Sequence, residues 1–202
     1  MFGRRRDQTF RVGDRKIRLS TPRSMPESDT GAMPVFDLVW PSGPQLANYL
    51  LNVDLDGKRV LDLGCGLGLV ALSLGSRRVD ITAMDLHPAA AELLHKNARR
   101  NKVRLSSVVT ASWAEPPRDL GQFDLVLASD VLYEPRQFSS LPGFLATHVR
   151  PGGQAFIVDP DRGMHQAFLD GMTGHFERVV PTPAWTGDGT TLFAFRRLDS
   201  AG

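Results

Sequence analysis

The sequence predicts an α/β domain built on a mainly parallel β-sheet. Two observations support this fold class: short β-prone runs alternate with helical segments along most of the chain, and a cluster of glycines follows the first such strand. The composition, 42% hydrophobic and 23% charged over 202 residues, suits one globular core. We therefore expect a single domain over residues 1–202, with an N-terminal arm, hairpin and loop in 1–35 and the core in 36–202.

The N-terminal part should form a hairpin, a loop and a helix. Residues 9–19 alternate apolar and polar side chains around Gly13 and Asp14, as in a hairpin with one buried face. Residues 21–34 contain three prolines and no period, which predicts a surface loop. The apolar positions within 44–51 favour a helix packed on the core.

The remaining elements alternate. We expect strands at residues 59–63, 79–84, 105–110, 123–128, 154–158, 176–180 and 191–195, and helices at 67–74, 88–101, 137–148 and 163–172. This order predicts a parallel sheet covered on both faces, with right-handed crossovers. No helix separates the last two strands. They should therefore pair as a hairpin across the loop 181–189, which places one antiparallel strand in the sheet.

Charge and cysteine content restrict the classes of partner. The 24 basic and 22 acidic residues leave a net charge of +2, too little for a strong field toward nucleic acid or membranes. The basic residues of 4–6 and 11–18 suggest a solvated, partly mobile arm, with docking to an acidic partner as the alternative. Cys65 is the single cysteine, and no early apolar run has the length of a signal-peptide core. We therefore expect a cytoplasmic monomer. The alternative is that the arginine-rich first residues are a short transit segment.

The loop of Gly64, Gly66 and Gly68 indicates a cofactor site, because ligands of parallel sheets bind beyond the carboxyl ends of the strands. Glycine lets the backbone approach a ligand closely. Dinucleotide-binding loops have their third glycine five residues after the first, where this chain has Leu69. Asp62 would repel a pyrophosphate but suits a cationic amino-acid group.

Asp85 ends the next strand, seventeen residues after Gly68, where a carboxylate can accept hydrogen bonds from both hydroxyls of a ribose. Capping of the helix at 88 is the alternative. Together, the run 60–68 and Asp85 resemble the first motifs of the seven-strand S-adenosylmethionine-dependent methyltransferases, over roughly residues 59–195. The resemblance implies a Rossmann-like sheet in the order 3-2-1-4-5-7-6 with strand 7 antiparallel, and S-adenosyl-L-homocysteine as product.

Asp130 and Tyr133 follow the fourth strand of this series and should reach the same rim as the glycine loop. A carboxylate and an aromatic ring suit a cationic amine. Asp130 alone would stabilise the charged lysine, so we assign it capture and orientation of the amine, while burial and the sulfonium charge lower the lysine pKa. Tyr133 would wall the lysine channel. The structural alternative is a turn cap and a packed ring.

The Asp-x-x-Tyr arrangement resembles the lysine methyltransferase branch that includes the electron-transfer-flavoprotein β-subunit enzymes and their bacterial relatives. Residues 34–47 resemble the entry segment of that branch, which implies that Trp40 borders the methionine end of the cofactor. Residues 159–162 resemble its Asp-Pro-x-Arg turn, so Arg162 either touches an acidic substrate surface or is a solvated turn residue.

Many relatives use an acidic residue followed by a tryptophan to hold adenine, whereas this chain has Ser112 before Trp113. We expect Trp113 to stack on the adenine ring and Ser112 to offer only a neutral contact. Cys65 should act through its main chain, and the scattered histidines predict no metal site. The cofactor-binding residues expected are therefore Trp40, Asp62, Gly64, Cys65, Gly66, Gly68, Asp85, Leu86, Trp113 and Ser129.

Three functions are consistent with these residues. The leading hypothesis is a protein-lysine N-methyltransferase, supported jointly by Asp130, Tyr133, Trp40 and the glycine loop. The second is a small-molecule N- or O-methyltransferase that uses the N-terminal hairpin as a lid. The third is a non-catalytic binding module that keeps the fold without the reaction, against which the carboxylates Asp62, Asp85 and Asp130 argue.

Overall fold

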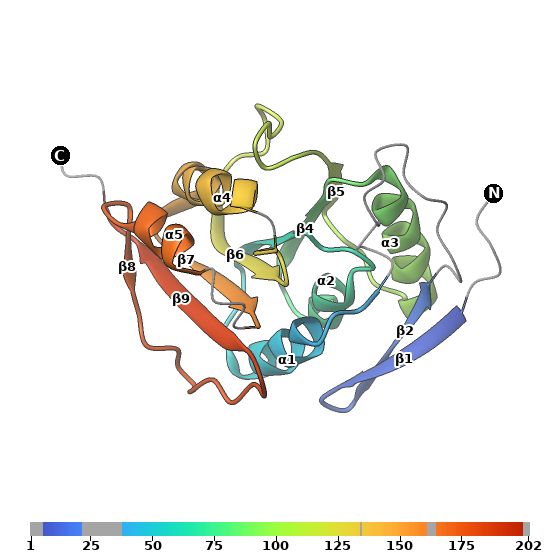
Figure 1. Cartoon of the computed structure of the whole chain (residues 1–202). Coiled ribbons are helices and arrows are strands. Elements are labelled where there is room, and N and C mark those ends of the chain that lie inside the picture. The colour runs from blue at the N-terminus through green and yellow to red at the C-terminus, as the bar shows by residue number, and fades with distance from the viewer. Residues whose placement is uncertain (1–5, 22–37, 134, 161–164, 200–202) are drawn as a thin grey trace.

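A computed structural model gives a seven-stranded sheet between two layers of helices, with a separate two-stranded sheet at one side (Figure 1). The structure describes residues 6–21, 38–133, 135–160 and 165–199. The expected loop beyond residue 21, the arginines at 4 and 5, and Arg162 lie outside these described residues.

The strands of the main sheet are β3 (Arg59–Leu63), β4 (Asp80–Asp85), β5 (Ser107–Thr110), β6 (Phe123–Ser129), β7 (Val149–Asp159), β8 (Phe176–Arg178) and β9 (Thr191–Arg197). Their order in space is β5-β4-β3-β6-β7-β9-β8. Strand β9 runs antiparallel to both of its neighbours, and the other pairings are parallel. The predicted strand order, the late hairpin and the single reversed strand are thus confirmed.

Helices cover both faces of the sheet because alternate strand residues face opposite layers. One apolar cluster joins the sheet to α1 (Ser42–Tyr49), the short η2 (Leu50–Asn52), α2 (Leu69–Leu74) and α3 (Pro88–Asn101). The other joins it to α4 (Pro135–His148) and α5 (His165–Met172). Val60 lies in the first cluster and its neighbour Leu61 in the second. None of the helices within the described ranges is long and apolar enough to cross a membrane.

The N-terminal hairpin pairs β1 (Arg6–Val12) with β2 (Arg15–Thr21), slightly longer than predicted. Its apolar face belongs to the core, since Val12, Ile17 and Leu19 are at most 1% exposed. The Arg15 guanidinium donates to the Ser73 carbonyl of α2 at 2.7 Å. Burial of one hairpin face thus packs residues 11–18 onto the helices, while the basic side chains of Arg11, Lys16 and Arg18 are exposed, as the expected solvated segment requires.

Candidate active site

The glycine loop joins β3 to α2 and folds back against the end of β4. The amide groups of Gly64 and Cys65 both donate to the Met84 carbonyl, at 2.8 and 3.1 Å. Gly68 has a left-handed φ of 85°, so α2 begins at Leu69 rather than at the expected residue 67. Gly64, Cys65 and Gly66 are partly exposed at the carboxyl end of β3, where the sequence placed the cofactor.

Two of the loop glycines also have no room for a side chain. A Cβ on Gly68 would overlap the Leu94 side chain of α3. A Cβ on Gly64, whose φ is 68°, would lie 2.8 Å from a methyl group of Val131. Both backbone conformation and close packing therefore require glycine at these positions, as a loop that cradles a ligand with its backbone does.

Asp62 is buried beneath the loop, with 3% of its surface exposed. Its carboxylate accepts a hydrogen bond of 2.9 Å from the Ala71 amide in the first turn of α2. Burial raises the pKa of this carboxyl group to about 7, and the nearby Asp85 charge contributes in the same direction. A buried carboxylate with a raised pKa gains from a cationic neighbour, and the amino group of an amino acid is one.

Asp85 binds both the glycine loop and the residue that caps the following helix. One carboxylate oxygen accepts from the Gly66 amide at 2.8 Å and the other from the His87 amide at 3.0 Å. The N-cap of α3 is His87 itself, whose ring nitrogen accepts from the Ala89 amide at 3.2 Å. Burial is the main cause of a raised pKa at Asp85. Each carboxylate oxygen can accept a further bond, so the arrangement is compatible with ribose hydroxyls.

The three residues expected near adenine differ in their exposure and in their hydrogen-bond partners. Leu86 follows Asp85 and is 63% exposed, so its apolar side chain is open to contact with a ligand. The indole N–H of Trp113 donates to the Ser140 hydroxyl of α4 at 3.0 Å, and the ring packs on the second apolar cluster. The Ser112 hydroxyl accepts from the Ala114 amide at 3.1 Å, a local turn contact.

Asp130 lies just beyond β6 and contacts the start of α1. Its carboxylate accepts a hydrogen bond of 3.2 Å from the Ser42 amide, across 88 residues of sequence. The side chain is buried and the backbone has a left-handed φ of 57°, while the Asp130 amide donates to the Val158 carbonyl at the end of β7. The N-cap residue of α1 makes no side-chain hydrogen bond to the helix. Asp130 therefore supplies the acceptor for one of the amides at the N-terminus of α1.

Other predicted residues surround this contact. Ser129 precedes Asp130, and its hydroxyl would lie 3.8 Å from a Cβ on Gly43, so the end of β6 touches the beginning of α1. Trp40, two residues before Ser42, is 40% exposed, and Tyr133 is 39% exposed. The structure thus brings the entry segment and the Asp130 loop together at one rim. Cys65, partly buried, has a pKa raised well above that of an ordinary thiol by burial, which disfavours a reactive thiolate.

Sequence reasoning missed two residues of this site. Ser42 contacts Asp130 through its main-chain N–H, which every residue except proline has, so nothing in its side chain signalled the role. Asp159 is fully buried and accepts from the Leu132 amide at 3.1 Å, which fixes the loop after β6. The Asp-Pro pair at residues 159 and 160 was the sequence signal that could have indicated this role of Asp159. Across the described part of the chain, no three His, Cys, Asp or Glu side chains gather in a way that could hold a metal ion.

A family model for the methyltransferase domain matches residues 44–185, well over half of the chain. The chain therefore belongs to the methyltransferase-domain family. Its glycine loop and seven-strand sheet place it among the S-adenosylmethionine-dependent methyltransferases, and S-adenosylmethionine is the cofactor. A solved structure, the T. thermophilus 16S rRNA N2 G1207 methyltransferase in complex with AdoMet and guanosine, shares this fold. It has a TM-score of 0.71 and 17% identity, covering 96% of this chain and 51% of that one.

Curated relatives include lysine methyltransferases. EEF1A lysine methyltransferase 3 of Mus musculus is 31% identical over 71% of this chain and 61% of its own length. The electron transfer flavoprotein beta subunit lysine methyltransferase of Danio rerio is 33% identical over 66% of this chain and 52% of its own. O-methyltransferases of ubiquinone biosynthesis also match, at 30 to 35% identity. The chain spans between half and three-fifths of the length of these two lysine methyltransferases.

Proposed function

We propose that this chain is an S-adenosylmethionine-dependent N-methyltransferase that methylates a lysine side chain of a protein. The observation that supports it most is the position of Asp130, a buried carboxylate held against the segment of Trp40, with Tyr133 three residues further on. Relatives named as lysine methyltransferases agree with it. We also propose a single catalytic domain over residues 1–202, active as a cytoplasmic monomer, without nucleic acid or membrane as partner.

The residues present fit the cofactor. The glycine loop (Gly64, Cys65, Gly66 and Gly68) would contact it through the main chain, because its three glycines adopt positive φ and carry no side chain that could keep a ligand away. Asp62 would bind the cationic amino group, whose charge offsets the burial that raises the carboxyl pKa. Asp85 would accept from the ribose hydroxyls, Leu86 and Trp113 would contact adenine, and Trp40 and Ser129 would border the methionine end.

S-adenosylmethionine supplies an electrophilic methyl group, so the protein mainly has to position the acceptor amine. Asp130 would capture and orient the lysine as its ammonium form, and Tyr133 would wall its approach. The amine must lose a proton before it attacks. Burial at the rim and the positive charge nearby would lower the lysine pKa, while Asp130 opposes this and therefore acts in binding and orientation.

The test is incubation of the purified protein with methyl-labelled S-adenosylmethionine and cell extract from which small molecules have been removed. Label in protein, recovered as methyllysine after hydrolysis, is the expected result. Label that appears only when the low-mass fraction is restored would instead favour a small-molecule N- or O-methyltransferase, the alternative that the ubiquinone-pathway relatives keep open. No calorimetric binding of S-adenosylhomocysteine would favour a non-catalytic module.

A further inference from the structure

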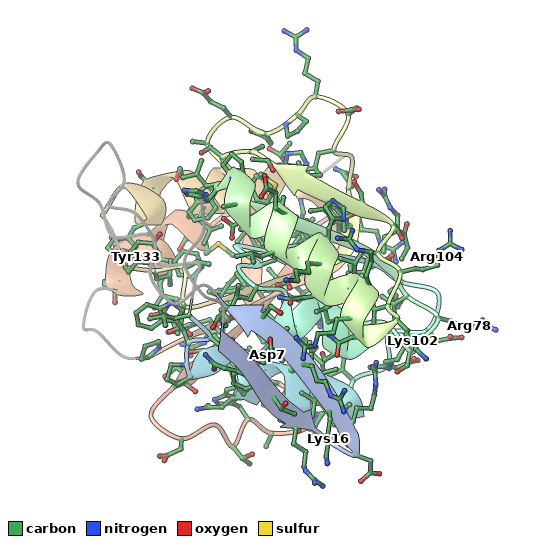
Figure 2. The ribbon with its side chains drawn as sticks, turned by 90° about the vertical axis from the view of Figure 1, so that its right-hand side faces the viewer. Asp7, Lys16, Arg78, Lys102, Arg104 and Tyr133 are labelled. Atoms are coloured by element: carbon green, nitrogen blue, oxygen red, sulfur yellow. The ribbon has the colours of Figure 1, made fainter. Side chains whose placement is uncertain are left out.

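The N-terminal hairpin and α3 lie side by side (Figure 2). Two asparagines of α3 bind the free edge of β2. The Ser20 amide donates to the Asn97 side-chain oxygen at 2.8 Å. One turn further along α3, the Asn101 side chain accepts from the Arg18 amide at 2.8 Å and donates to the Arg18 carbonyl at 2.7 Å. Helix α3 thus satisfies backbone groups of this edge that a further strand would otherwise bind.

Asn97 differs from Asn101 because its other end reaches the glycine loop. Its side-chain nitrogen donates to the Leu67 carbonyl at 3.1 Å, between Gly66 and Gly68. The Asn97 side chain is 0% exposed, so water cannot replace either of its bonds. A single buried amide group therefore joins the hairpin to the loop.

The same face of α3 touches the loop a second time. Leu94, three residues before Asn97, packs where a Cβ on Gly68 would lie. Residues three apart share one side of a helix, so Leu94 and Asn97 contact the loop together. The Leu94 contact sets the distance between helix and loop, and the bond from Asn97 sets the orientation of the Leu67 peptide.

We propose that Asn97 is a positioning residue that couples docking of the N-terminal hairpin to the shape of the cofactor loop. Without Asn97, the Leu67 carbonyl and the Ser20 amide would both lose their partner. The loop would then lose a restraint on the backbone groups that face the ligand, and preorganised groups bind more tightly than mobile ones. This inference rests on the proposed assignment of the loop to the cofactor.

The hairpin accordingly acts as a fixed part of the cofactor site rather than as a lid. Its apolar face is buried, and the Gly13 amide at its turn donates to the Asn48 side chain of α1 at 3.0 Å. An ion pair of 2.7 Å between Arg100 of α3 and Asp7 of β1 holds its other end to the helix. Opening the hairpin would break all three kinds of contact at once.

The first experiment compares Asn97→Ala with Asn101→Ala by calorimetry, with S-adenosylhomocysteine as the probe. Both variants lose hairpin contacts and should unfold at lower temperature, but only the first loses the loop contact. We expect Asn97→Ala to raise the Kd about tenfold, and Asn101→Ala to leave it within about twofold. Methyl transfer by Asn97→Ala at saturating cofactor should keep nearly the full rate. Equal Kd values for the two variants would overturn the inference.

A second pair of variants tests the hairpin end, should Asn97→Ala fail to fold. Ser20→Pro removes the amide that binds Asn97, on a strand edge where proline is tolerated. Ser20→Ala is its control, since both variants lose the hydroxyl, which donates to Asp7 and accepts from Arg100, and only the proline also loses the amide. We expect a Kd about threefold higher for Ser20→Pro than for Ser20→Ala. The same Kd in both would refute the coupling, whereas a native protein that binds no S-adenosylhomocysteine would refute the proposed function itself.

Discussion

The candidate site has a cofactor side, formed by the glycine loop with Asp62 and Asp85, and an acceptor side, formed by Asp130 and Tyr133. The two sides differ in how far apart in the sequence the contacting residues lie. On the cofactor side, contacts form within one strand-helix-strand unit, as when the Gly66 amide donates to the Asp85 carboxylate across 19 residues. On the acceptor side, the Ser42 amide donates to Asp130 across 88 residues. The first side depends on local backbone conformation, and the second depends on the packing of α1 against β6 and β7.

The largest effect should come from Gly68→Ala, which breaks the cofactor side at its tightest point. Alanine would adopt an unfavourable left-handed φ, and its Cβ would overlap Leu94. We expect a loss of about 3 kcal/mol in the free energy of unfolding, measured by urea denaturation, together with loss of cofactor binding.

Gly174→Ala is the matched control, because Gly174 has the same φ of 85° but nothing within 4 Å of its added Cβ. It should lose about 1 kcal/mol from the backbone conformation alone. If the two variants are equally stable, packing against Leu94 contributes nothing and the loop is less closely held than the structure indicates.

The next effect should come from Asp130→Asn, which tests the acceptor side alone. Asparagine keeps an oxygen for the Ser42 amide and tolerates the φ of 57°, so α1 stays capped while the negative charge is lost. We expect the initial rate of label transfer to protein to fall on the order of a hundredfold, with an unchanged Kd for S-adenosylhomocysteine.

Asp119→Asn, which removes one negative charge at an exposed acid in the loop before β6, is the control for the change in net charge. Full activity of Asp130→Asn would leave the carboxylate with a purely structural role in capping α1. A weaker Kd in that variant would place Asp130 on the cofactor side and remove the distinction between the two sides.

The smallest effect should be a pH dependence on the cofactor side. Burial raises the pKa of Asp62 to about 7, so the folded protein without cofactor favours the protonated carboxyl. The stability that this group contributes is therefore fully present below about pH 4 and is lost as the pH rises through about 7. A cationic ligand favours the ionised form, so its Kd should fall about threefold between about pH 6.5 and 7.5.

Calorimetry with S-adenosylmethionine at the two pH values measures this change, and Asp62→Asn supplies the comparison. Asparagine can still accept from the Ala71 amide but does not titrate, so its Kd should vary less with pH. An identical pH dependence in both proteins would assign the titration to the ligand or to another group.

Element positions were predicted best where local signals were strong. Residues 88–101 were expected as a helix and form α3, because Pro88 suits the first helical turn and an apolar stripe continues from it. Strand β7 begins at Val149, five residues before the expected 154, because Val149 already pairs with Phe123 and an irregularity in the pairing then takes up Pro151 and Gly152. Asn97 was a missed signal, a polar residue among the buried Leu93, Leu94 and Ala98.

The sequence by itself determined the fold class, the late hairpin and the position of the cofactor loop. Glycine spacing, strand patterning and helix starts are local properties, and the resemblance to a known family added the order of the strands. Only the tertiary structure decided that Ser42 binds Asp130 and that Asn97 joins the hairpin to the loop. The partners in these bonds are main-chain groups, which carry no residue-specific signal, and folding of the sheet and helices brings them together from distant parts of the chain.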